Sequence, residues 1–209
     1  MKELAKALLR IKAVSLSPEK PFTWASGIKS PIYCDNRLIL SYKEERELTL
    51  NEMKRVVSEK YPEAQCLMGT ATAGIPHAAI VAWELGIPMG FVRGKAKDHG
   101  KENRIEGKVF LGMKTVVIED LISTAGSSVD AVNALREAGC DVLGIVSIFT
   151  YNLKKGEETL KKNDVENTSL TDYDELIEAA IEENYIESAS LAKLMEWKKD
   201  PSNEDWMTK

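Results

Sequence analysis

The stretch from residue 115 to residue 128, TVVIEDLISTAGSS, decides the fold of this chain. Its apolar first half predicts a buried strand, and two acids, Glu119 and Asp120, follow directly. A loop of small residues comes next, and apolar positions at helical spacing then continue to Gly139. Ligands of open α/β sheets bind where a strand ends in such a turn. The stretch therefore predicts a ligand site at the carboxyl end of a parallel strand.

The residue types in this turn suit a sugar phosphate. Hydroxyl groups and unhindered backbone N–H groups at the start of a helix attract an anion. Two adjacent carboxylates accept hydrogen bonds from sugar hydroxyls or coordinate a divalent cation. Phosphate on one side and a diol on the other describe a ribose phosphate. A strand, turn and helix with solvated acids would show the same order of elements, so both interpretations stay open at this point.

The rest of the chain predicts an α/β fold. Apolar periodicity indicates helices over residues 3–13 and 43–60 and strands over residues 65–69, 88–93 and 141–150. Strands and helices alternate from about residue 65 to residue 150, which is typical of a doubly wound, mostly parallel sheet. Beyond residue 151 the composition predicts surface helices, followed by a poorly ordered tail after Asp200.

Composition limits the possible partners. The chain has 209 residues, of which 44% are hydrophobic and 29% charged, as expected for one soluble globular domain. Its net charge of −5 argues against nucleic acid and anionic membranes as partners. Three scattered cysteines, Cys34, Cys66 and Cys140, lack metal-ligand spacing, and the N-terminus lacks the features of a signal peptide. We therefore expect a cytoplasmic protein with reduced thiols and without a dedicated set of metal ligands.

A second turn of small residues follows the strand predicted at residues 65–69. Residues 69–74, GTATAG, precede an alanine-rich helix that ends at Gly86. Small side chains let backbone N–H groups approach a ligand closely, although a tight strand-to-helix turn has the same composition. His77 lies inside this helix and is interpreted as a packing residue rather than a catalyst.

One segment is basic, although the chain as a whole is acidic. Residues 93–104, RGKAKDHGKENR, carry six basic or histidine side chains and only two acids. No apolar anchor lies between Val92 and Ile105, so burial cannot offset the entropy lost on ordering. We expect this segment to be mobile without a ligand. It is either a solvated excursion or a lid for a polyanion.

The whole run from residue 115 to residue 128 resembles the phosphoribosyl pyrophosphate signature of type I phosphoribosyltransferases. In that family the paired acids hold the ribose hydroxyls, the loop holds the 5′-phosphate, and a turn at the place of residues 69–74 holds pyrophosphate. The resemblance implies the type I phosphoribosyltransferase fold in a single domain. We expect a hood-forming segment at residues 1–40, a core sheet at residues 65–150 and C-terminal helices at residues 151–209.

A second motif narrows the resemblance. Residues 26–35, SGIKSPIYCD, are similar to the N-terminal hood of orotate phosphoribosyltransferases, above all those of Gram-positive bacteria. This implies transfer of phosphoribose from phosphoribosyl pyrophosphate to orotate, giving orotidine 5′-monophosphate and pyrophosphate, with Mg²⁺ as cofactor. It also implies orotate contacts by Ser123 and Lys29.

The same resemblance assigns the remaining site residues. It implies Lys97, His99 and Asp120 as catalytic residues. In the family, a mobile loop at the place of residues 94–103 reaches the pyrophosphate, in part across the interface of a homodimer. The residues expected around phosphoribosyl pyrophosphate are Arg93, Lys97, His99, Glu119, Asp120, Leu121, Ile122, Ser123, Thr124, Ala125, Gly126 and Ser127.

The chain also departs from the enterobacterial members of that family. Four of their basic or aromatic site positions are occupied here by Ala25, Thr72, Ala73 and Gly94. An arginine that contacts orotate after the last core strand is replaced within Phe149-Thr150-Tyr151. Two alternatives therefore stay open, a transferase for xanthine or uracil and a non-catalytic sensor of phosphoribosyl pyrophosphate.

The lid interpretation makes a prediction about quaternary structure. Lys97→Ala should lower turnover ~10²-fold, because the lysine stabilises charge on the leaving pyrophosphate. If Lys97 acts across a twofold interface, mixing Lys97→Ala with inactive Asp120→Asn creates hybrid dimers with one intact site. Random subunit exchange should then restore about a quarter of wild-type activity. No recovery after proven exchange, or a monomer by light scattering, would contradict a lid that acts in trans.

Overall fold

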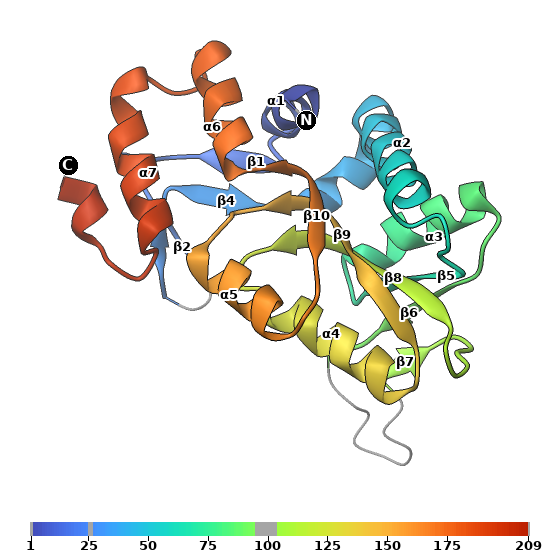
Figure 1. Cartoon of the computed structure of the whole chain (residues 1–209). Coiled ribbons are helices and arrows are strands. Elements are labelled where there is room, and N and C mark those ends of the chain that lie inside the picture. The colour runs from blue at the N-terminus through green and yellow to red at the C-terminus, as the bar shows by residue number, and fades with distance from the viewer. Residues whose placement is uncertain (1, 25–26, 95–103, 209) are drawn as a thin grey trace.

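A six-stranded sheet in the order β10-β9-β8-β5-β6-β7 forms the centre of the molecule. The computed structural model describes residues 2–24, 27–94 and 104–208. All neighbouring strands are parallel except β6 and β7. The strands are β5 (Cys66–Thr70), β6 (Met89–Val92), β7 (Ile105–Glu106), β8 (Lys114–Ile122), β9 (Asp141–Thr150) and β10 (Asn167–Asp172). The predicted α/β fold with a mostly parallel sheet is thus confirmed (Figure 1).

Strand β8 carries the stretch that opened the sequence analysis and is paired on both sides. Ile118 lies opposite Gly69 of β5 and Val146 of β9. Val116, Val117 and Ile118 are fully buried, as expected for a parallel strand covered by helices on both faces. Because all three strands run in the same direction, their carboxyl ends meet at one edge of the sheet.

Helices cover both faces of the sheet and divide the core into two clusters (Figure 1). The larger cluster joins one face to α1 (Lys2–Arg10), α2 (Lys43–Lys60), α3 (Gly74–Leu85) and α6 (Tyr173–Glu182). The smaller cluster joins the other face to α4 (Gly126–Glu137) and α5 (Lys154–Lys162). Successive residues of β8 point to opposite faces of the sheet, so Ile118 packs in the larger cluster and Val117 in the smaller one.

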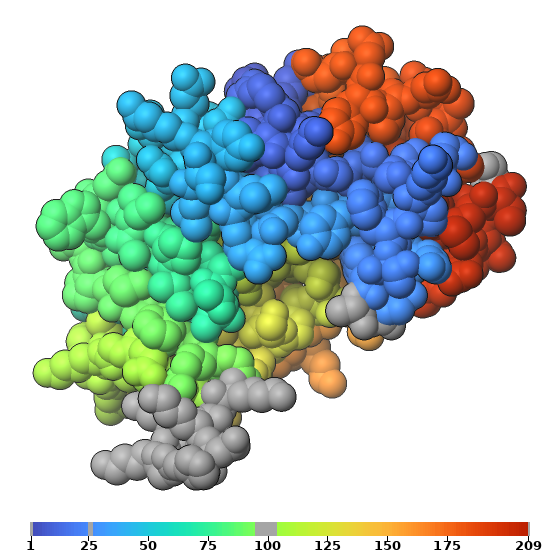
Figure 2. Space-filling model, turned by 180° about the vertical axis from the view of Figure 1, so that it is seen from behind, coloured from blue at the N-terminus to red at the C-terminus, as the bar shows by residue number. Residues whose placement is uncertain are grey.

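The N-terminal segment builds two small antiparallel sheets above the carboxyl edge of the main sheet. Strand β1 (Val14–Leu16) pairs with β4 (Ile32–Cys34), and β2 (Phe22–Thr23) pairs with β3 (Lys29–Ser30). A 3₁₀ helix, η1 (Asn36–Ser41), leads from β4 into α2. We call residues 14–41 the hood. Figure 2 shows the hood in blue beside the C-terminal segment in red.

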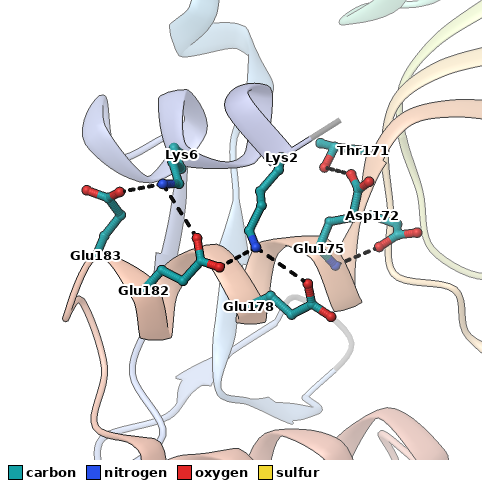
Figure 3. Close-up of polar contacts among 8 residues, drawn as sticks. All are labelled: Lys2, Lys6, Thr171, Asp172, Glu175, Glu178, Glu182 and Glu183. Carbon is teal, nitrogen blue, oxygen red and sulfur yellow. Dashed lines mark hydrogen bonds and ion pairs between the residues drawn. The ribbon is translucent and has the colours of Figure 1, made fainter.

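Ion pairs tie the N-terminal helix to α6 (Figure 3). Lys2 contacts Glu178 at 3.8 Å and also pairs with Glu182, while Lys6 contacts Glu183 at 2.7 Å. Such exposed pairs stabilise a fold by roughly 0–1 kcal/mol each. The apolar face of α1, in which Leu8 is fully buried, therefore contributes more to docking than the charges do.

The C-terminal part differs from the expectation in two places. Residues 167–172, NTSLTD, form β10 at the edge of the sheet, outside the predicted sheet range of residues 65–150. Their mostly polar composition gives no apolar strand pattern, and only Leu170 and Thr171 of this edge strand are buried. The tail after Asp200 is not loose either, because η3 (Asp205–Thr208) buries Trp206 to 1% exposure. Helix α7 (Leu191–Lys199) precedes it, as predicted.

Within the described residues, no helix is long and apolar enough to cross a membrane.

His77 gives a testable consequence of burial. Its side chain is fully buried in α3, and neither ring nitrogen has a hydrogen-bond partner among the described residues. Burial lowers the pKa of His77 to about 4. Between about pH 6.5 and pH 4 the unfolded chain therefore binds a proton that the folded protein does not, and stability falls as the pH drops.

We expect His77→Leu to remove this loss. The free energy of unfolding is measured in urea at pH 7.5 and at pH 5.0. Because pH 5.0 lies about 1.5 units below the pKa of an unfolded histidine, lowering the pH should cost wild type ~2 kcal/mol more than it costs the variant. A difference between the two proteins that does not change with pH would contradict the assignment of a neutral, buried imidazole.

Candidate active site

A cavity of about 350 Å³ lies at the carboxyl ends of β5, β6 and β8. Its walls come from the two small-residue turns, the end of β6 and the first turns of α4. The lining residues are Thr70, Ala71, Thr72, Ala73, Val92, Arg93, Gly94, Arg104, Glu119, Asp120, Leu121, Ser123, Ser127, Asp130 and Ala131. The structure therefore brings together the turn at residues 69–74 and the turn after β8, as the sequence predicted for a ligand site at this edge.

Glu119 is the most constrained side chain of the site. It is 5% exposed, and both carboxylate oxygens accept hydrogen bonds from within the protein. Oε1 accepts from the Thr70 hydroxyl at 2.5 Å and from the Asp120 N–H at 3.1 Å. Oε2 accepts from the Ser128 hydroxyl at 2.8 Å. One carboxylate thus joins the end of β5, the end of β8 and the first turn of α4.

The two acids of the signature have different surroundings. Burial raises the pKa of Glu119 to about 7, against the opposing effect of the hydrogen bonds from Thr70 and Ser128. Burial also raises the pKa of Asp120, and the nearby Arg37 guanidinium lowers it. Glu119 is held by protein hydroxyls, whereas Asp120 is only half-buried and lines the cavity. Of the two, Asp120 is better placed to meet a ligand hydroxyl or a cation.

The hood contacts the strand that carries the two acids. Asn36, fully buried at the start of η1, donates from Nδ2 to the backbone oxygen of Asp120 at 2.7 Å. The next residue, Arg37, pairs with Asp35 at 2.6 Å. Asn36 was not expected as a site residue, because no local pattern marks a contact between residues 84 positions apart. This bond fixes the hood against the strand that carries the acids.

The loop after β8 ends in a helix start whose backbone groups suit an anion. Helix α4 begins at Gly126, after Ala125 in the left-handed region with φ 60°, and no side chain caps it. The N–H groups at the start of the helix have no partner within it and favour a negative charge. Ser123 and Ser127 line the cavity beside them.

The other expected residues of this loop are placed differently. Ile122 and Ala125 are buried at 2% and 3% exposure and pack in the smaller core cluster. Thr124 faces a neighbouring cavity that also touches Trp24. Helix α5 supports the loop from behind, since a Cβ on Gly156 would lie 2.5 Å from the Ser123 carbonyl oxygen. Glycine is therefore required where α5 meets the loop.

The turn at residues 71–73 is shaped by close packing of α3 against β8. A Cβ on Gly74 would clash with the backbone oxygen of Ile118 and the hydroxyl of Thr70. The peptide bond between Ala71 and Thr72 is cis. Both turns consequently hold backbone groups close to the cavity.

Arginines stand at the mouth of the cavity and hold both ends of the basic segment. The Arg93 N–H donates to the Arg104 carbonyl oxygen at 2.8 Å, and Arg104 Nε donates back to Arg93 at 3.0 Å. Two further nitrogens of Arg104 bind Asp130 of α4 at 3.0 and 2.5 Å. Arg93 also lies 3.2 Å from Glu106. The expected residues Lys97 and His99 lie outside the described residues.

Lys29 is not among the residues that line this cavity. It lies on β3, and its Nζ donates to the Thr23 hydroxyl across the β2–β3 hairpin at 2.8 Å. In the structure it therefore stabilises the hairpin.

The arrangement suits chemistry on a phosphorylated sugar. A helix start offers N–H groups to one anion, a second turn and two arginines face another part of the cavity, and Asp120 lies between them. No group of three or more metal-ligating side chains occurs among the described residues, so a hard cation would need oxygens from a ligand as well.

Comparison with known proteins agrees with this geometry. Residues 48–185 match the model of the phosphoribosyl transferase domain. The chain is 57% identical to orotate phosphoribosyltransferase of Bacillus subtilis over 206 residues, covering 99% of this chain and 95% of the relative. The Bacillus cereus protein of the same name is 55% identical and covered to 99% on both sides.

A solved structure is similar over most of its length. Orotate phosphoribosyltransferase from Aeropyrum pernix superimposes with a TM-score of 0.76 at 27% sequence identity, covering 88% of this chain and 99% of that chain.

The Glu119 contacts predict a difference between two substitutions. Glu119→Ala leaves the Thr70 and Ser128 hydroxyls without their acceptor and opens a cavity, so we expect a loss of ~2–4 kcal/mol in the free energy of unfolding. Glu119→Gln keeps one acceptor oxygen, and its amide can donate to the Ser128 hydroxyl, so the loss should stay below ~1.5 kcal/mol. Urea denaturation measures both values. Equal losses would show that the hydrogen bonds do not join these elements.

Proposed function

Since the chain belongs to the orotate phosphoribosyltransferase family, we propose a role for each part of its site in the family reaction. The enzyme converts orotate and phosphoribosyl pyrophosphate to orotidine 5′-monophosphate and pyrophosphate in pyrimidine synthesis. The observation that carries the assignment of roles is the meeting of two anion-binding turns with Asp120 in one cavity.

The 5′-phosphate lies at the start of α4. Its charge is stabilised by the N–H groups of Gly126 and Ser127 and by the hydroxyls of Ser123 and Ser127, which line the cavity. A contact by Thr124, which faces the neighbouring cavity, stays a prediction from the sequence. Leu121, Ile122 and Ala125 contribute only through the backbone, because the side chains of Ile122 and Ala125 are buried in the core.

The ribose hydroxyls lie against the acids. Asp120 accepts directly from a hydroxyl, since it lines the cavity. Glu119 acts mainly by holding Thr70, Ser128 and the backbone of Asp120 in place. This division refines the expectation that the paired acids hold the ribose hydroxyls.

Pyrophosphate lies against the turn at residues 70–73 and Arg93. Loss of pyrophosphate from C1 of the ribose leaves positive charge on the sugar and negative charge on the leaving group, so donors that stabilise this charge lower the barrier. Lys97 and His99 keep their predicted role as cations for the leaving group on the basis of sequence. Orotate attacks through N1, and Ser123 and the hood position its ring.

Mg²⁺ fits this chemistry. Asp120 would hold the ion together with oxygens of the substrate, which agrees with the preference of Mg²⁺ for few carboxylates and many phosphate or water ligands. When bound, Mg²⁺ neutralises charge on the pyrophosphate.

We also propose a homodimer in which residues 94–103 complete the neighbouring site. The homodimer rests on the resemblance to the family, and the exposed side chains of Trp83 (85%) and Leu111 (88%) are available to such an interface. Arg93 and Arg104 hold the two ends of that segment at the mouth of the cavity. The cytoplasmic location stays a prediction from the sequence.

The substrate assignment is tested with competing bases. We expect Mg²⁺-dependent loss of orotate absorbance near ~295 nm when phosphoribosyl pyrophosphate is present, with uracil, hypoxanthine and adenine inert. Uracil lacks only the carboxylate, and a site built for that anion leaves polar groups unpaired without it, so discrimination should reach ~10⁴-fold in kcat/KM. Equal turnover of uracil and orotate would rule out the orotate site, and full activity with excess chelator would rule out the role of Mg²⁺.

A further inference from the structure

The C-terminal segment packs directly on the hood, although its sequence suggested no role in the site. Helix α7 lies beside β2, and η3 follows it at the C-terminus (Figure 1). Trp197 of α7 is fully buried and belongs to the larger core cluster. Its contacts show how the C-terminal segment supports the hood.

Trp197 makes a specific polar contact with the hood. Its Nε1 donates to the backbone oxygen of Lys29 in β3 at 3.2 Å. Its ring meets the ring of Trp24 edge-on, with centroids 5.7 Å apart and planes at 84°. Trp24 in turn donates from Nε1 to the backbone oxygen of Ile32 in β4 at 3.2 Å. Two indoles in contact thus bind the backbones of both hood strands that carry the SPIYC segment.

The same ring also contacts the strand beside the acids. Trp197 lies 5.9 Å from Tyr151 at 82°, and Tyr151 lies 5.4 Å from Trp24. Tyr151 follows β9 directly, and its N–H donates to the Ile122 oxygen at 3.0 Å, one residue before Ser123. An aromatic cluster of Trp24, Tyr151 and Trp197 therefore joins the hood to the loop that binds the ligand.

Helix α7 is itself anchored to the main fold. The Tyr173 hydroxyl at the start of α6 donates to the Leu194 oxygen at 3.0 Å, and its ring lies 5.5 Å from Trp197. Helix α7 thus contacts the main fold through Tyr173 and the hood through Trp197. A shift of α7 would consequently move β3 relative to Ser123.

We propose that Trp197 is a positioning residue for the base, which sets the distance between the hood and the loop after β8. This inference rests on the proposed function, in which the hood covers orotate. A misplacement of about 1 Å at a reacting centre can cost up to ~10²-fold in rate. The hydrogen bond from the Trp197 N–H reaches only the backbone of Lys29 in the hood, so its loss acts first on the base side. The start of α4 is held separately, by the bond from Ser128 to Glu119.

Two matched substitutions test the role. Trp197→Phe keeps an aromatic ring and removes the N–H that binds the Lys29 oxygen. Trp206→Phe is the control, because Trp206 is equally buried in the same segment but its Nε1 has no hydrogen-bond partner among the described residues. We expect Trp197→Phe to raise the KM for orotate about tenfold with the KM for phosphoribosyl pyrophosphate changed less than about twofold. Trp206→Phe should change neither KM by more than about twofold.

Two results would overturn the proposal. One is an equal rise of the orotate KM in both variants, which would make Trp197 an ordinary core residue. The other is an equal change of both KM values in Trp197→Phe. If Trp197→Phe does not fold, Tyr173→Phe removes only the hydroxyl bound to Leu194, and it should raise the orotate KM about threefold. An unchanged value there would also overturn the proposal.

Substitutions in the hood itself distinguish a failure of this inference from a failure of the proposed function on which it rests. Tyr33 is 48% exposed on β4, and Lys29 lies on β3. If Tyr33→Ala and Lys29→Ala both leave the orotate KM unchanged, the hood does not bind the base and the proposed base site is wrong, as is the inference. If either raises it while Trp197→Phe does not, only the role of Trp197 is wrong.

Discussion

The buried carboxylate of Glu119 is the constraint on which the site depends. Removing a carboxylate from water is unfavourable, so its two oxygens need donors, and the nearest ones belong to Thr70 of β5, Ser128 of α4 and the backbone of Asp120. Satisfying one charge thereby fixes the relative position of two turns that are far apart in the chain. Asp120 is left half-buried at the cavity. Rigid elements hold the ligand-facing groups, as precise positioning requires.

The site also separates anion binding from base binding. In the proposed assignment, phosphate groups meet backbone N–H groups at helix starts, which are held by the close approach of Gly74 to β8 and of Gly156 to the loop after β8. In the same proposal the base meets the hood, which is attached to the acid strand through Asn36 and supported from behind by Trp24 and Trp197. The base side can therefore change without disturbing the phosphate side, which is consistent with one fold that serves several bases.

Charge is distributed unevenly over this acidic protein. The net charge is −5, yet the sequence concentrates basic side chains at residues 93–104, and the two described arginines of this segment, Arg93 and Arg104, line the cavity. In the described part of that segment Arg104 is neutralised by Asp130, and Arg93 lies near Glu106. These pairs fix the ends of the segment rather than provide free charge. Local fields of this kind attract a polyanion more effectively than the net charge suggests.

The sequence by itself determined the sheet, the turn after β8 and the acids, because apolar periodicity and strand-turn-helix order are local properties. It also determined the orotate motif of the hood. It did not predict β10, whose polar residues form a strand only because β9 offers a free edge, nor the burial of Trp206. Only the tertiary structure decided that Thr70 and Ser128 hold the buried Glu119 while Asp120 stays half-buried at the cavity, and that Asn36 and Trp197 hold the hood. Three of these contacts join residues 49, 84 and 168 positions apart, and no local pattern encodes a hydrogen bond over such distances.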